Sequence, residues 1–192
     1  MLITSYLQQL KKQYQTQTTG RRKLAELSSQ AQHLAKQAIF AAQRDNLPEA
    51  DKLLAEANSL LTQGQLLTRK VKELESLGSY RAALEEYVEA ELFTKFLQTG
   101  KLDKVGKFNI TPEVYLGGLS DMVGELVRYA IKLATAGKIK EVDKLVEVGT
   151  MVVGELAAMN LTGILRTKFD QAKQHLRRLE DIRYDLSIRR HV

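Results

Sequence analysis

The chain has 192 residues, of which 44% are apolar and 27% are charged, and it contains no cysteine. It is long and apolar enough for one substantial core, so we expect a single domain spanning residues 1–192. The composition excludes disulfides, thiolate metal sites and cysteine nucleophiles, and three scattered histidines argue against a histidine-rich zinc site. We find no run of about 18 apolar residues and no leader-like segment, which predicts a soluble, cytoplasmic protein without membrane contact.

The net charge of +6 is unevenly distributed along the chain. Residues 1–24 carry +5 and residues 166–192 carry +4, which leaves −3 for the residues between them. Basic ends around an acidic middle favour a polyanionic partner that is held by the ends. Solvation of two amphipathic helices by Lys and Arg would produce the same distribution.

Helical periodicity begins near the first residue. Residues 2–44 contain no proline and a single glycine, Gly20, at which we expect a break in the first helix. The turn at residues 44–48 combines an Asp-Asn pair with Pro48, a proline suited to the first turn of a new helix. This turn predicts a second helix that continues to about Leu74.

The third helix is expected to begin after residues 76–79 and to reach about Gln98. Residues 99–110 contain two glycines and no helical face, so they predict a loop. Thr111 and Pro112 are typical of a helix cap and a first helical turn, and Gly137 is typical of a helix end. A fourth helix is therefore predicted between them.

Two further helices are expected at about residues 139–160 and 166–188, separated by residues 161–163. No alternating strand pattern and no repeat of 20 to 50 residues is evident. The sequence therefore predicts an all-α fold, a bundle of six to seven long antiparallel helices.

The run at residues 85–91, EEYVEAE, places carboxylates inside an otherwise apolar helix. At about 100° per residue, Glu86 and Glu89 point into the middle of a broad apolar face, whereas Glu91 and Thr94 lie on the other side. A carboxylate aimed at a core must be paired, hydrogen-bonded, protonated or bound to a metal. Periodicity alone leaves open an ion pair, a subunit contact and a metal.

A second acidic pair lies in a polar stripe on the fourth helix. Asp121 and Glu125 are four residues apart and project together. Three glycines beside them leave the backbone approachable by a ligand or by another helix. Arg128 follows one turn beyond Glu125, where it can contact a phosphate oxygen or form a simple pair with Glu125. A solvated face with weak ion pairs is the alternative interpretation of this stripe.

Antiparallel packing of the third and fourth helices would bring the two acidic pairs together. Four carboxylates cannot share a small site as bare anions, because like charges raise each other's pKa. A Mg²⁺ or Mn²⁺ ion would resolve this conflict, and such an ion can activate water and stabilise charge on a phosphate. The pairs therefore favour, without requiring, a hard metal ion.

Three motifs resemble the translin superfamily, which includes translin and translin-associated factor X. They are residues 84–90 (LEEYVEA), 115–128 (YLGGLSDMVGELVR) and 184–189 (YDLSIR), in this order within roughly residues 78–190. The resemblance implies an all-helical protomer that assembles into a closed, barrel-like oligomer, often an octamer. It also implies binding of single-stranded RNA or DNA.

The resemblance also carries a prediction about chemistry. In the factor X branch, carboxylates at the positions of four residues form a Mg²⁺-dependent endoribonuclease site that faces the interior; these positions are Glu86, Glu89, Asp121 and Glu125. All four acids are present here, while the ending YDLSIR is more similar to translin itself. We therefore expect a homo-oligomer that cleaves single-stranded or small structured RNA. The alternatives are a non-catalytic oligomer that binds single-stranded RNA or DNA, and a scaffold that binds no nucleic acid.

In the catalytic interpretation the four carboxylates bind Mg²⁺ or Mn²⁺, one of them serves as general base, and Arg128 stabilises phosphate charge. The side chains expected to hold the nucleic-acid backbone are Arg21, Arg22, Lys23, Arg177 and Arg178. With no tryptophan and 6% aromatic residues, the chain offers few platforms for stacking bases, and sequence-specific readout is not supported.

Overall fold

The structure is a computed structural model that describes residues 2–106 and 108–189. Within these residues it contains six α-helices, one short 3-10 helix and no strand, which confirms the expected all-α fold. The elements are α1 (Leu2–Gln43), α2 (Leu47–Lys70), η1 (Lys72–Leu74), α3 (Gly78–Thr99), α4 (Pro112–Thr135), α5 (Ile139–Ala158) and α6 (Gly163–Arg189). None of the described helices is long and apolar enough to cross a bilayer.

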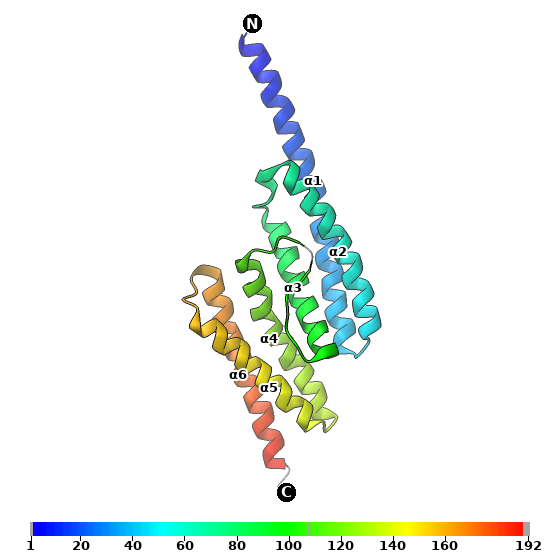
Figure 1. Cartoon of the computed structure of the whole chain (residues 1–192), viewed down its shortest axis with the longest axis vertical. Coiled ribbons are helices and arrows are strands. Elements are labelled where there is room, and N and C mark those ends of the chain that lie inside the picture. Colours follow the sequence, from blue (N-terminus) through cyan, green and yellow to red (C-terminus); the bar gives the residue numbers. More distant parts are fainter. Residues whose placement is uncertain (1, 107, 190–192) are drawn as a thin grey trace.

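Helix α1 is continuous, and the break expected at Gly20 is wrong. The good helix formers around Gly20 outweigh the roughly 1 kcal/mol that a glycine costs in a helix interior. The missing side chain also lets η1 approach, because a Cβ at this position would lie 2.9 Å from Leu74 Cδ1. The first turns of α1 extend beyond the rest of the molecule (Figure 1), and residues 3–16 are all exposed.

Local capping chemistry explains most helix ends. Asn46 caps α2 by accepting a hydrogen bond from the Glu49 backbone N–H at 3.4 Å, and Thr111 caps α4 in the same way through Val114. Gly100 and Gly137 adopt the left-handed conformation, with φ of 69° and 71°, just after α3 and α4. These ends lie within about a residue of those predicted.

The second helix ends earlier than expected, at Lys70 rather than at Leu74. Val71 adopts an extended conformation, and the chain then forms the single turn η1. This turn places Leu74 in the core, where only 2% of its surface is exposed. Burial of Leu74 thus favours a redirected chain over a longer α2.

Helix α3 is the centre of the fold. It packs against α1, α2 and α4, while α4 in turn packs against α5 and α6. Buried residues from α1 to α6 form one continuous hydrophobic core. Such a central position leaves α3 little surface for solvent, so its polar side chains need partners inside the protein.

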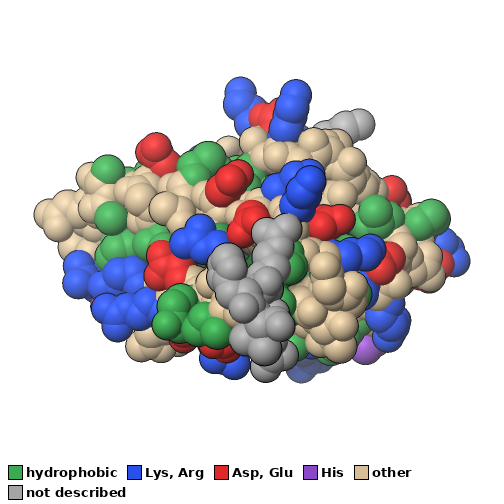
Figure 2. Space-filling model, turned by 90° about the horizontal axis from the view of Figure 1, so that it is seen from below, with side chains coloured by type: hydrophobic (Ala, Val, Ile, Leu, Met, Phe, Trp, Pro, Cys, Tyr) green, Lys and Arg blue, Asp and Glu red, His purple; other side chains and the backbone are tan. Residues whose placement is uncertain are grey.

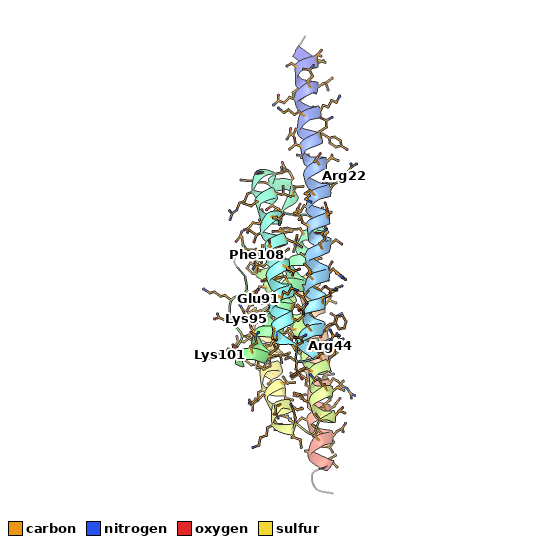
Figure 3. The ribbon with its side chains drawn as sticks, turned by 90° about the vertical axis from the view of Figure 1, so that its right-hand side faces the viewer. Arg22, Arg44, Glu91, Lys95, Lys101 and Phe108 are labelled. Carbon is orange, nitrogen blue, oxygen red and sulfur yellow. The ribbon has the colours of Figure 1, made fainter. Side chains whose placement is uncertain are left out.

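The loop after α3 runs back along that helix instead of forming a tight hairpin. The Gly106 backbone N–H donates to Glu91 Oε1 at 3.3 Å, and the Phe108 ring lies 5.3 Å from the Tyr87 ring, edge to face. Figure 3 shows Phe108 near Glu91 on the side of α3 away from α1. The loop therefore covers the face of α3 that carries Glu91 and Thr94, both of which are buried.

As a consequence α3 and α4 run parallel, and the expected antiparallel packing of these two helices is wrong (Figure 1). Phe93 contacts Tyr129 through rings 6.0 Å apart, and earlier on both helices Glu85 lies against Gly117. Contacts thus advance in the same direction on both helices. The loop can make this crossover because 12 extended residues span about 40 Å, more than the roughly 33 Å of a 22-residue helix.

Gly118 permits the close approach of α4 to α3. A Cβ at this position would lie 2.7 Å from the Glu85 backbone O and 2.8 Å from Val88 Cβ. The sequence left open whether the glycines make room for a ligand or for another helix. At Gly118 the space is filled by α3. This approach sets the spacing of the side chains on α3 and α4.

Candidate active site

The four predicted carboxylates lie where α3 and α4 meet, and we call them the acidic cluster; they are Glu86, Glu89, Asp121 and Glu125. All four are partly buried. Parallel packing brings the later acid of α3, Glu89, close enough to both acids of α4 for their charges to act on it. The direction of α4 differs from our expectation, yet the two acidic pairs still lie near each other, because each pair is near the middle of its helix.

Glu89 stands at the centre of the acidic cluster. Burial, followed by repulsion from Asp121, Glu86 and Glu125, raises the pKa of Glu89 from 4.5 to about 9. Among the described residues no side chain or backbone group forms a hydrogen bond or ion pair with its carboxyl group. Without a bound cation, Glu89 therefore holds a proton at neutral pH.

Glu86 is contacted from α1. Gln32 Nε2 donates to its Oε2 at 3.3 Å, and Lys36 Nζ lies 3.7 Å from the same oxygen. Burial raises the pKa of Glu86 and outweighs these two favourable contacts. Half of the lysine side chain is exposed, so this is a weak pair at the edge of the acidic cluster.

Glu125 has the best-satisfied carboxylate of the four. Arg128 donates to its two oxygens at 3.0 and 3.2 Å, which is the simple pair that the sequence left open for Arg128. Gln43 on α1 donates through Nε2 to Oε2 at 2.8 Å and to the Glu125 backbone O at 3.0 Å. These contacts hold the end of α1 against α4.

Asp121 is held by Lys168 on α6. The ammonium Nζ lies 2.5 Å from Asp121 Oδ2 and 2.6 Å from Glu85 Oε1, and only 17% of the lysine side chain is exposed. Burial alone would lower the pKa of Lys168, but hydrogen bonds to Asp121 and Glu85 outweigh it and raise the pKa. Lys168 therefore stays charged and offsets part of the negative charge of the acidic cluster.

Our sequence reasoning missed the partners that α1 and α6 contribute. On α1 these are Gln32, Lys36 and Gln43, which share one side of the helix at spacings of four and seven residues. On α6, Lys168 precedes the buried Ala172 by one turn and so falls on an apolar stripe. A lysine on an apolar stripe was a signal that the sequence offered.

The predicted nucleic-acid contacts are dispersed. All five basic residues are exposed; they are Arg21, Arg22, Lys23, Arg177 and Arg178. Arg22 lies at the middle of α1 (Figure 3), whereas residues 177 and 178 belong to the second half of α6. Seen from below, Lys and Arg are interspersed with Asp and Glu (Figure 2), so this end of the molecule is not uniformly basic.

The acidic cluster suits a hard metal ion by its donor chemistry, because Mg²⁺ and Mn²⁺ prefer carboxylate oxygens. As the described side chains stand, however, no three Asp, Glu, His or Cys side chains converge closely enough to hold a metal ion. Asp121 is turned towards Lys168, Glu125 towards Arg128, and Glu89 has its pKa raised. The residues present therefore fit such an ion only if these contacts are exchanged and Glu89 releases its proton.

Comparison with known proteins identifies relatives of the chain. Residues 19–190 match the family model described as the Translin family. No match is found among curated proteins. Among solved structures, apo-NeC3PO has a TM-score of 0.86 at 23% identity, with 94% of this chain and 96% of that chain covered.

Two further solved structures have the same fold. AfC3PO in complex with duplex RNA gives a TM-score of 0.85 at 22% identity, covering 96% of this chain and 98% of that chain. AfC3PO alone gives 0.84 at 23% identity, covering 97% and 100%. At these identities the likeness concerns the arrangement of the helices.

Proposed function

The chain belongs to the Translin family, and from this premise we propose that it is a homo-oligomeric endoribonuclease that uses Mg²⁺ or Mn²⁺ at the acidic cluster. The observation that carries the proposal is that Glu89 lies, without a cationic partner among the described residues, within reach of the charges of three other carboxylates at the α3–α4 contact. Those three carboxylates each have a cationic partner. A structural ion-pair network explains the three but leaves Glu89 in a costly position.

Burial of acids beside one another destabilises a fold, and groups with strongly shifted pKa values are concentrated at functional sites. A divalent cation would neutralise the repulsion that Glu89 experiences from its three neighbours. The ligands would be Glu86, Glu89, Asp121 and Glu125. When bound, the ion would supply an activated water and stabilise charge on the phosphate.

The surrounding residues would have distinct roles. Arg128 lies at the surface, with 52% of its side chain exposed, and its guanidinium can turn from Glu125 to a phosphate oxygen. One carboxylate of the acidic cluster would accept the proton of the attacking water. Lys168 would limit the net negative charge that an approaching RNA backbone meets.

RNA as the substrate is supported by a structural relative. AfC3PO has been solved with duplex RNA, and the present chain shares its fold. We extend RNA binding to this chain, with contacts to the backbone from Arg21, Arg22, Lys23, Arg177 and Arg178. Because these side chains lie far apart on one protomer, a closed assembly such as an octamer would be needed to line a common surface with them.

Cleavage of a labelled single-stranded RNA tests the proposal. Wild-type protein is incubated with Mn²⁺ or Mg²⁺, with and without chelator, beside Glu89→Ala, Asp121→Ala and the exposed control Glu147→Ala. We expect metal-dependent cleavage that falls at least about 100-fold in the two cluster variants and is unchanged in the control. Circular dichroism checks folding, and light scattering gives the number of subunits.

The second candidate function is a non-catalytic oligomer that binds RNA or DNA. The pairing of Asp121 with Lys168 and of Glu125 with Arg128 favours it, because such pairs also occur in purely structural networks. Wild-type protein that binds RNA in a salt-dependent manner but leaves it uncut with either metal would establish this alternative. Cleavage that persists in chelator or in Glu89→Ala would instead disprove the assigned site.

A further inference from the structure

Phe40 is an exposed aromatic residue at the edge of the acidic cluster. It lies on α1, and 48% of its surface is exposed. It shares one side of the helix with Lys36 and Gln43, which contact Glu86 and Glu125 respectively. The same stripe of α1 therefore presents an aromatic ring between two side chains that touch the acidic cluster.

Arg128 connects the ring to the acidic cluster directly. Its guanidinium carbon lies 5.3 Å from the centre of the Phe40 ring, while Nη1 donates to both oxygens of Glu125. One arginine thus contacts an aromatic ring and a carboxylate of the acidic cluster at once. A group bound on this pair would lie next to any phosphate at the acidic cluster.

Single exposed apolar side chains are common on proteins and need no explanation by themselves. Tyr14 and Tyr184 are more exposed than Phe40, at 69% and 65%. Among the described residues, however, neither of these tyrosines takes part in an aromatic or cation–π contact, whereas Phe40 is paired with Arg128. Phe40 is therefore distinguished by its surroundings and not by exposure alone.

We infer that Phe40 and Arg128 form a platform on which an unpaired nucleobase of the RNA stacks, next to the phosphate that reaches the acidic cluster. This inference rests on the proposed function and assigns a substrate-positioning contact to it. Aromatic rings and guanidinium planes both stack on bases, and base–aromatic stacking is tolerant of sequence because every base has a π face.

The platform has a consequence for substrate choice. A base inside a duplex is stacked on its neighbours and cannot lie against Phe40, whereas a base in a single strand, a loop or an overhang can. We therefore expect cleavage at unpaired nucleotides in preference to paired ones. The platform recognises a base as a flat apolar group, so which of the four bases is present should matter little for cleavage.

The absence of tryptophan from the chain makes a direct test possible. In Phe40→Trp the new indole is the sole tryptophan, and stacking of a base should quench its fluorescence. Short oligouridine is titrated in chelator, so that binding is measured without cleavage. We expect saturable quenching at an affinity close to that of the wild type, and no quenching with an oligomer of abasic ribose phosphates.

Affinity measurements with truncated side chains complete the test. Phe40→Ala and Phe40→Leu should weaken oligouridine binding about 5- to 150-fold, the range for loss of one stacked base, and Phe40→Tyr should retain it. Tyr184→Ala is the matched control and should bind normally. The abasic oligomer should bind wild type and Phe40→Ala equally, because it has no base to stack.

Each contrary result is informative. Equal oligouridine affinity of wild type and Phe40→Ala, or an equal loss for the abasic oligomer, would overturn the platform while leaving the proposed nuclease intact. A reduced number of subunits in Phe40→Ala would also overturn it, by making Phe40 a subunit contact. Wild-type protein that binds through Phe40 without cleaving would refute the nuclease and keep the platform. A lack of RNA binding by the wild type would refute both.

Discussion

Two acids on opposite sides of α3, Glu89 and Glu91, are both withdrawn from solvent but differ in their surroundings. Glu91 lies under the loop, where it accepts a hydrogen bond from the Gly106 N–H and pairs with Lys95. Glu89 faces three other carboxylates and has no partner among the described residues. Glu91, which has a cation and a backbone donor as partners, holds the loop in place. Glu89, which has carboxylates as neighbours, is the residue that we propose as a metal ligand.

The largest expected difference concerns cleavage in Glu89→Gln and Glu91→Gln, the same substitution on the two sides of α3. Glu89→Gln should lower the cleavage rate at least about 100-fold. It should also raise the melting temperature of the metal-free protein at neutral pH, because a neutral amide spares the fold the cost of protonating a buried carboxyl group. Glu91→Gln should cost about 1–2 kcal/mol of unfolding free energy, through loss of a charge-assisted hydrogen bond, and leave cleavage by the folded protein unchanged. RNA cleavage and calorimetry measure the two effects. Equal effects of the two variants on cleavage would show that Glu89 has no role in cleavage that Glu91 lacks.

The next largest effect is expected on the stability of the fold when the spacing between α3 and α4 is changed. Gly118→Ala places a methyl group against the Glu85 backbone O and should destabilise the fold by about 1–3 kcal/mol, since backbone cannot move aside as a side chain can. Gly154→Ala on α5 is the control, because a Cβ there meets nothing within 4 Å. That change should be neutral or stabilising by up to about 1 kcal/mol. Urea unfolding measures both variants, and a Gly118→Ala protein at least as stable as Gly154→Ala would contradict the expectation.

The two sides of α3 can also be compared through their lysines. Lys168 pairs with Asp121 of the acidic cluster, and Lys95 pairs with Glu91 under the loop. Lys168→Met removes a positive charge from Asp121, so the acidic cluster should bind Mn²⁺ about tenfold more tightly, a change of roughly 1.4 kcal/mol. Lys95→Met, on the loop side, should leave Mn²⁺ binding unchanged. Electron paramagnetic resonance of free Mn²⁺ reports the affinity without any assay of activity. Weaker binding in Lys168→Met would instead make the lysine a support that orients Asp121.

The last expected effect is a pH dependence of the metal-free stability, which is small for each pH unit. Glu89 has a higher pKa in the folded protein, about 9, than its ordinary value of 4.5, so the folded state binds more protons between these values. Stability should therefore fall as the pH rises from 5 to 8.5, by about 1.4 kcal/mol for each pH unit. At about 2–4 °C per kcal/mol this is roughly 3–6 °C in melting temperature per pH unit. Glu89→Gln should flatten this dependence, and Glu91→Gln should not.

Local sequence determined the helices and several of their ends. The caps at Asn46 and Thr111 and the left-handed Gly137 follow from side chains and backbone preferences within a few residues. The two acidic pairs were also apparent, because helical spacing alone shows which side chains share a side of a helix. Gly20 was misjudged, since a weak local preference yields to favourable neighbours on both sides.

Tertiary structure alone decided the direction of α4 and the partners of each acid. A 12-residue connection permits either a hairpin or a crossover, and the choice depends on what the loop and the helices bury, which involves residues distant in sequence. Helical periodicity states that a side chain faces a core, but not which side chain it meets there. The contacts of Lys168, Gln43 and Phe40 were therefore decided by the tertiary structure, which places α6 and α1 beside the acidic cluster, because these contacts join residues that are tens of positions apart.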